Sequence, residues 1–142
     1  MTGAEATSIR ADLERVLIVE DNPFFLRFVK EALQSRFPSM DVFESVCGEE
    51  AMQKIKTLKP KAIFTDLRLP GENGLELTKR IKSQYPNIIV VIITNYDLPE
   101  YREAAYRCKA DHFLSKDSFL NMISILPDRE TDQNDSLRKE RF

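Results

Sequence analysis

The sequence predicts an α/β fold in which five parallel strands alternate with five helices, a doubly wound (βα)5 arrangement. Three observations support this prediction. Short runs rich in β-branched residues alternate with longer segments whose apolar residues recur at helical spacing. Pro, Gly or Asn marks most of the junctions between them. The chain of 142 residues, 42% of them hydrophobic, suits one domain with a single core.

The first half of the chain supplies two strands and two helices. Strands are expected at residues 16–19 and 40–45, and helices at residues 22–37 and 49–58. Asn22 is a good helix cap and Pro23 suits the first helical position, so the first helix should begin there and end before Pro38. Its core-facing residues at helical spacing are expected to be Phe25, Phe28, Val29, Ala32 and Leu33.

The second half repeats the pattern three times. Strands are expected at residues 62–65, 88–93 and 111–114, and helices at residues 74–85, 99–108 and 118–126. The run at residues 88–93 is apolar and β-branched throughout, as a parallel strand covered on both faces requires. Right-handed crossovers between such units favour the flavodoxin-like strand order 2-1-3-4-5.

The ends of four predicted strands carry polar side chains of related chemistry. Glu20 and Asp21 follow the first strand, Asp66 ends the third, Thr94 follows the fourth, and Lys116 follows the fifth. The carboxyl ends of parallel strands meet at one edge of a sheet, so these side chains should converge. Three carboxylates repel one another unless a cation joins them, and their oxygens suit Mg²⁺. The pattern predicts a phosphoryl-transfer site with Asp66 as the acceptor.

Each of these residues also has an ordinary structural explanation. Asp66 could be a turn residue or a helix cap, and the Glu20–Asp21 pair could complement the dipole of the first helix. Lys116 could be a solvent-exposed lysine. The right chemical type at all four strand ends, in the right order, favours a functional site over these explanations.

Residues 15–126 resemble the receiver domain of two-component response regulators, which has a CheY-like fold. The matching motifs are the acidic pair Glu20–Asp21, the segment from Asp66 to Gly74 (DLRLPGENG), Ile-Ile-Thr94, and the segment from Ala110 to Lys116 (ADHFLSK). The resemblance implies a phospho-accepting regulatory domain rather than an enzyme, with self-catalysed phosphotransfer and autodephosphorylation only. It also implies that a histidine kinase or a phosphotransfer protein phosphorylates Asp66.

The resemblance further implies a role for each residue around Asp66. Asp21 and Asp66 would bind Mg²⁺ or Mn²⁺ directly, Arg68 would contribute its backbone carbonyl, and Glu20 would act mainly through water. Thr94 would bond the attached phosphoryl group.

Two further roles concern the response to phosphorylation. Lys116 would form an ion pair with the phosphoryl group, and Phe113 matches an aromatic switch position that turns inward when the threonine moves. The output surface would comprise residues 99–108, 111–114 and 118–126. It would contact an unknown output protein, and it could also join two copies of the chain.

Four positions bear on the details of this resemblance. Asn95 stands where a small residue usually follows the threonine, and Asp117 replaces a proline that supports a cis peptide in the family. A cis bond before a non-proline residue costs about 3 kcal/mol, so a trans Lys116–Asp117 peptide is expected, with Asp117 capping the last helix. Arg68, Asn95 and Tyr96 occupy positions expected to tune phosphorylation and dephosphorylation rates.

Composition narrows the partners and the compartment. The net charge of −2 and the absence of a basic stripe argue against direct nucleic-acid binding. The longest apolar run is too short to span a membrane, and no signal peptide is visible, so the cytoplasm is the expected compartment. Residues 1–14 are expected to be a flexible arm, residues 15–126 the receiver domain, and residues 127–142 a disordered tail.

A stand-alone receiver is the leading interpretation, and two alternatives stay open. One is a small Mg²⁺-dependent phosphatase or hydrolase of the same fold, although no phosphate-binding glycine loop of the Walker A type is present. The other is a degenerate receiver that signals without phosphorylation. Mass measurement after exposure to a small phosphodonor would separate a working receiver from a degenerate one, and a substrate-turnover assay would identify a hydrolase.

Overall fold

The computed structural model describes residues 14–125, so the predicted arm, apart from Glu14, and the predicted tail lie outside the described residues. Five parallel strands form one sheet in the order β2-β1-β3-β4-β5, which confirms the predicted fold class. The strands are β1 (Arg15–Val19), β2 (Asp41–Ser45), β3 (Ala62–Asp66), β4 (Ile89–Thr94) and β5 (His112–Ser115). The helices are α2 (Pro23–Arg36), α3 (Gly48–Leu58), α4 (Gly74–Gln84), α5 (Pro99–Arg107) and α6 (Lys116–Ile125).

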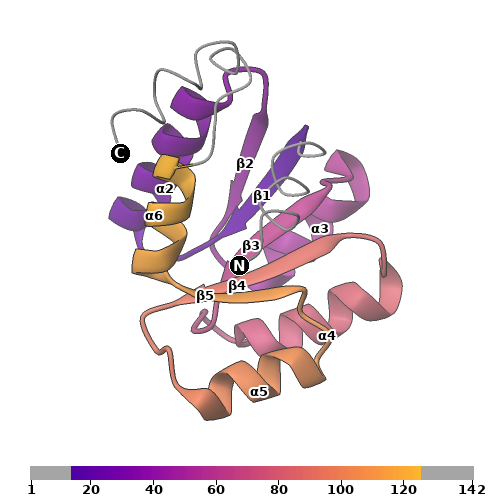
Figure 1. Ribbon diagram of the computed structural model, residues 1–142. Helices are drawn as coiled ribbons and strands as arrows, with labels where there is room; N and C mark the ends of the chain where they lie inside the picture. Colours follow the sequence, from indigo (N-terminus) through magenta and orange to yellow (C-terminus); the bar gives the residue numbers. More distant parts are fainter. Residues whose placement is uncertain (1–13, 126–142) are drawn as a thin grey trace.

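Helices cover both faces of the sheet (Figure 1): α2 and α6 lie on one side, and α3, α4 and α5 on the other. Alternate residues of the central strand β3 therefore enter different parts of the core. Phe64 packs towards α2 and α6, where its ring centroid lies 5.0 Å from that of Phe119. Ile63 packs with Leu77 and Ile81 of α4 on the opposite face. Within residues 14–125, no helix has the length and apolar character needed to cross a membrane.

Helix α2 begins as predicted but buries a different set of residues. The Asn22 side chain accepts hydrogen bonds from the backbone N–H groups of Phe24 and Phe25, and Pro23 occupies the first turn. The buried residues are Leu26, Val29 and Leu33, at the spacing of one helical face. Phe28, expected in the core, is 59% exposed, because it lies one turn after the exposed Phe24 on the outer side.

Helix α6 begins earlier than predicted, at Lys116, and its cap is a different residue. Ser115 Oγ accepts the backbone N–H of Ser118 at 3.0 Å, which is the bond that a helix cap makes. Asp117 lies exposed in the first turn, so the prediction that Asp117 caps this helix was wrong. No peptide bond between residues 14 and 125 is cis, which confirms the expected trans Lys116–Asp117 bond.

Candidate functional site

The sheet brings the three predicted carboxylates together at its carboxyl edge. Strands β1 and β3 are neighbours, with Val19 level with Thr65, so the residues that follow them are adjacent. Carboxylate oxygens of Glu20, Asp21 and Asp66 all lie within 4.8 Å of one another. Glu20 and Asp66 are buried, whereas Asp21 is exposed.

Lys116 supplies a cation to this cluster from the first turn of α6. Its Nζ lies 2.7 Å from Glu20 Oε1 and 3.5 Å from Asp66 Oδ2. The same ammonium lies 4.2 Å from the centroid of the Phe25 ring, a cation–π contact. The ammonium group thus pairs with two of the three carboxylates, and the cluster keeps an excess of negative charge.

Glu20 shows the electrostatic consequence of this crowding. Burial raises the pKa of the Glu20 carboxyl from 4.5 to about 6, and the negative charge of Asp66 acts in the same direction. The hydrogen bond from Lys116 and the backbone N–H of Asn22, which donates to Oε2 at 3.2 Å, partly oppose the increase in pKa. Removal of negative charge, or arrival of a cation, would therefore stabilise the site.

Asp66 is held in place by the turn that follows it. Its Oδ1 accepts the backbone N–H of Leu67 at 2.7 Å, and Leu67 O accepts the backbone N–H of Gly74 at 2.7 Å. The chain passes so close here that a Cβ at residue 74 would collide with the carbonyl oxygen of Asp66 and lie 3.0 Å from Leu67 Cα. Glycine at position 74 is therefore part of what positions the carboxylate.

An open cavity of about 750 Å³ lies above the cluster, and several predicted residues line it. Lys116 and the three carboxylates form part of its surface, together with Arg68, Asn95 and Tyr96. The Arg68 guanidinium stacks 4.3 Å from the centroid of the Tyr96 ring, a contact that the sequence does not indicate. Phe24, also unforeseen, reaches the same rim.

Two predicted residues lie beneath this surface. Thr94 is fully buried, and its Oγ1 accepts the backbone N–H of Tyr96 at 2.9 Å. Phe113 has a buried ring, with the Arg102 guanidinium 5.1 Å from its centroid. Arg102 also donates to the carbonyl oxygen of Phe113 at 3.2 Å and pairs with Asp97 at 2.9 Å, which ties α5 to β5 and to the loop after β4.

The donor set is suited to a divalent cation that prefers oxygen ligands. The three carboxylates supply hard oxygen atoms from two neighbouring strands, and Asp21 is open to solvent. A divalent cation would balance the charge that Lys116 leaves uncompensated. The cavity above the cluster is large enough to admit a phosphoryl group.

Known proteins with similar sequences include several response regulators. The family model for the response regulator receiver domain matches residues 16–125. The chain is 31% identical over 112 residues to the DNA-binding transcriptional regulator NtrC of Klebsiella pneumoniae, which covers 79% of this chain and 24% of NtrC. It is 30% identical over 101 residues to an uncharacterized response regulatory protein of Vibrio cholerae, which covers 70% of this chain and 38% of that protein. The chain thus spans less than half the length of these two relatives.

Solved structures show the same fold. The signal receiver domain of NarL from Mycobacterium tuberculosis superposes with a TM-score of 0.70 at 32% identity, covering 77% of this chain and 88% of that one. The Mn²⁺-bound form of response regulator Rcp1 superposes with a TM-score of 0.68 at 24% identity, covering 78% of this chain and 88% of that one, a likeness of fold alone.

Proposed function

This chain belongs to the family of response regulator receiver domains, and from this premise we propose that Asp66 accepts a phosphoryl group from a histidine kinase or a phosphotransfer protein. The observation that carries the proposal is the convergence of Glu20, Asp21 and Asp66 with Lys116 beneath an open cavity. Phosphorylation would then change the surface of α5, β5 and α6 and so control an output partner.

The hydrogen bonds of Asp66 favour one of its oxygens as the nucleophile. Oδ1 is already bonded to the Leu67 N–H, whereas Oδ2 faces Lys116 at 3.5 Å. We assign the attack on phosphorus to Oδ2, which would form an acyl phosphate while the bond between phosphorus and the donor nitrogen breaks. Lys116 supports this step, because an ammonium held beside the reacting oxygen offsets charge on the transferred group.

The carboxylates also offer oxygen ligands for the divalent metal ion that the family implies. Asp21, Asp66 and the backbone carbonyl of Arg68 would hold Mg²⁺ or Mn²⁺, with Glu20 bound mainly through water. A cation in this position would neutralise phosphate oxygens during transfer. Exposure of Asp21 leaves one side of the cluster open, which suits a cation that keeps several water ligands.

We propose that Thr94 and Lys116 respond once the phosphoryl group is attached. In the structure, Thr94 Oγ1 accepts a hydrogen bond from the backbone N–H of Tyr96. If the Thr94 hydroxyl turned towards the phosphoryl oxygen, this bond would pull the loop after β4 with it. Lys116 would exchange its Glu20 partner for the phosphoryl group. Because Arg102 joins this loop to the Phe113 carbonyl, movement of the loop would reach β5 and the buried switch residue Phe113.

The stacked Arg68 and Tyr96 side chains, with Asn95 beside them, are proposed to tune the lifetime of the phosphoryl group. They line the cavity above Asp66, where an attacking water would approach. A double-mutant cycle of Arg68→Ala and Tyr96→Ala tests this role. If the stacked pair shields the site, each single substitution should shorten the lifetime and the double variant should add little further.

Phosphorylation itself is tested by the intact mass of the protein after incubation with acetyl phosphate and Mg²⁺. The proposal predicts a gain of one phosphoryl group that requires the metal and is absent from Asp66→Asn and from an EDTA control. No gain despite measurable Mg²⁺ binding would favour a receiver that signals without phosphorylation. Catalytic release of phosphate from p-nitrophenyl phosphate would favour the hydrolase alternative.

A further inference from the structure

A second cavity lies at the amino edge of the sheet, opposite the acidic cluster. It measures about 670 Å³ and lies where α3 and α4 end and where β3 and β4 begin. Its apolar surface includes Ile55, Pro60, Tyr85 and Ile88. Cavities of this size and character are typical of small-molecule sites. None of the residues assigned to phosphotransfer lines this cavity.

Hydrogen bonds hold both walls of this cavity in a defined shape. On the α4 side, Lys82 Nζ donates to the carbonyl oxygen of Ile88 at 2.7 Å and pairs with Asp111 at 2.7 Å. On the α3 side, Lys59 has a left-handed backbone with φ 47°, and its N–H donates to Ile55 O at 3.0 Å. The backbone N–H of Ile89 then donates to Lys61 O at 3.0 Å and joins the two walls.

Three lysines, Lys56, Lys59 and Lys61, contribute to the lining, and all of them are exposed. None of the ten lining residues is acidic. Within residues 14–125, none of the three ammonium groups has a carboxylate within ion-pair distance or a hydrogen-bond partner. Three unpaired lysine side chains thus border this apolar cavity, although the chain as a whole has a net charge of −2.

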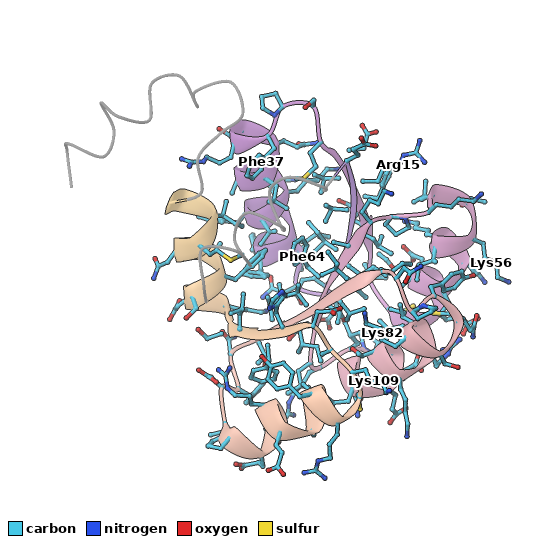
Figure 2. All side chains as sticks on the ribbon, turned by 45° about the vertical axis from the view of Figure 1, so that its right-hand side comes forward. Arg15, Phe37, Lys56, Phe64, Lys82 and Lys109 are labelled. Atoms are coloured by element: carbon cyan, nitrogen blue, oxygen red, sulfur yellow. The ribbon has the colours of Figure 1, made fainter. Side chains whose placement is uncertain are left out.

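The helix dipole explains only one of these lysines. Lys56 lies in the last turn of α3, where a cation complements the partial negative charge of the helix end, and Figure 2 shows it beside this end. Lys59 and Lys61 come after the last turn, on the segment that leads into β3. Their charges are therefore available to an anion at the mouth of the cavity.

We propose that this cavity binds a small ligand that combines a flat apolar ring with one anionic group. The ring would lie between Tyr85 and Pro60, and the anion would contact Lys59 and Lys61 at the rim. The apolar lining explains why the ligand needs a ring, and the unpaired ammonium groups explain why it needs a negative charge. Binding here would not require phosphorylation.

The probe for this proposal is 1-anilinonaphthalene-8-sulfonate, which carries a flat ring system and one sulfonate. Its neutral analogue N-phenyl-1-naphthylamine lacks the anionic group and serves as the matched probe. Binding is followed by dye fluorescence and by amide NMR shifts in protein held in EDTA. The test variant is Lys59→Gln/Lys61→Gln, and the control is Lys79→Gln, which removes an exposed lysine of α4 outside the cavity.

We expect the anionic dye to shift amides of residues 55–61 and 84–88 and to bind more tightly than the neutral dye. Each lysine removed should raise the Kd about threefold, since exposed charge pairs contribute modestly, whereas Lys79→Gln should leave it unchanged. An unchanged Kd in the double variant, equal binding of both dyes, or shifts confined to the acidic cluster would overturn the proposal. If AMP displaces the dye, the anionic group of the ligand is a phosphate; if salicylate displaces the dye, the anionic group is a carboxylate. If neither compound displaces the dye even in large excess, the proposal is also overturned.

Discussion

Glu20 gives the sharpest test of the electrostatics of the acidic cluster. The folded protein raises the pKa of this carboxyl from 4.5 to about 6 because the group is buried beside Asp66. Between these two pH values the folded protein binds the Glu20 proton more tightly than the unfolded chain does, so the free energy of unfolding must fall as pH rises. Glu20→Gln removes this titration and leaves an oxygen that can still accept the Lys116 hydrogen bond.

The size of the effect follows from the two pKa values. The Glu20 contribution is fully present below about pH 4.5 and is lost above about pH 6. The two values correspond to a total of about 2 kcal/mol, of which about half is lost midway between them. In the absence of a divalent cation, Glu20→Gln should therefore match the wild type near pH 4 and exceed its stability by up to about 2 kcal/mol at pH 8.

Urea denaturation in EDTA at a series of pH values measures this difference. Titrations elsewhere in the protein cancel when wild type and variant are compared at each pH. Glu31→Gln, at an exposed position on the outside of α2, is the matched control and should give a difference that does not change with pH. A flat difference for Glu20→Gln, or a variant less stable than the wild type at pH 8, would refute the electrostatic account of the cluster.

Three further predictions concern the metal, the turn and the link to β5. Mg²⁺ at a hundredfold excess over its Kd should stabilise the wild type by about 2.7 kcal/mol, and Asp21→Asn should lose most of that gain in thermal melts; equal gains in both would contradict the metal assignment. Gly74→Ala should cost about 1–3 kcal/mol in urea denaturation, because its Cβ collides with the Asp66 carbonyl, and an unchanged midpoint would show that the turn adapts freely. Arg102→Gln should lose about 1 kcal/mol of local stability and speed amide exchange in β5 about fivefold, since the contacts with Phe113 disappear; unchanged exchange would rule out the proposed link.

The parts of the fold that could be predicted from the sequence are those set by local chemistry. Asn22 and Pro23 fix the start of α2 whatever the rest of the chain does, and the β-branched run of β4 suits only a strand covered on both faces. The convergence at the carboxyl edge followed from topology, because parallel strands end together. The approximate place of Asp66 therefore needed no knowledge of any side-chain contact.

Predictions failed where two local choices were equally good. Periodicity allowed either Phe28 or Leu26 on the inner face of α2, and packing against the sheet selected Leu26. Both Ser115 and Asp117 can cap a helix, and the end of β5 decided in favour of Ser115. The stacking of Arg68 on Tyr96 joins loops that follow two different strands, so no pattern within one segment could indicate it.

The two candidate sites differ in how strongly they conflict with a stable fold. Glu20 and Lys116 are charged residues that a fold would not bury without another reason. In the sequence, the carboxyl edge was recognised because such residues follow several strands that end together. Lys59 and Lys61 cost the fold little, because lysines after a helix end are common and remain hydrated. Only the cavity between the ends of α3 and α4, together with the lack of ion-pair partners for these lysines within residues 14–125, distinguishes them from ordinary surface lysines. A candidate binding site whose residues cost the fold little therefore looks like ordinary surface in the sequence. Only the structure distinguishes it.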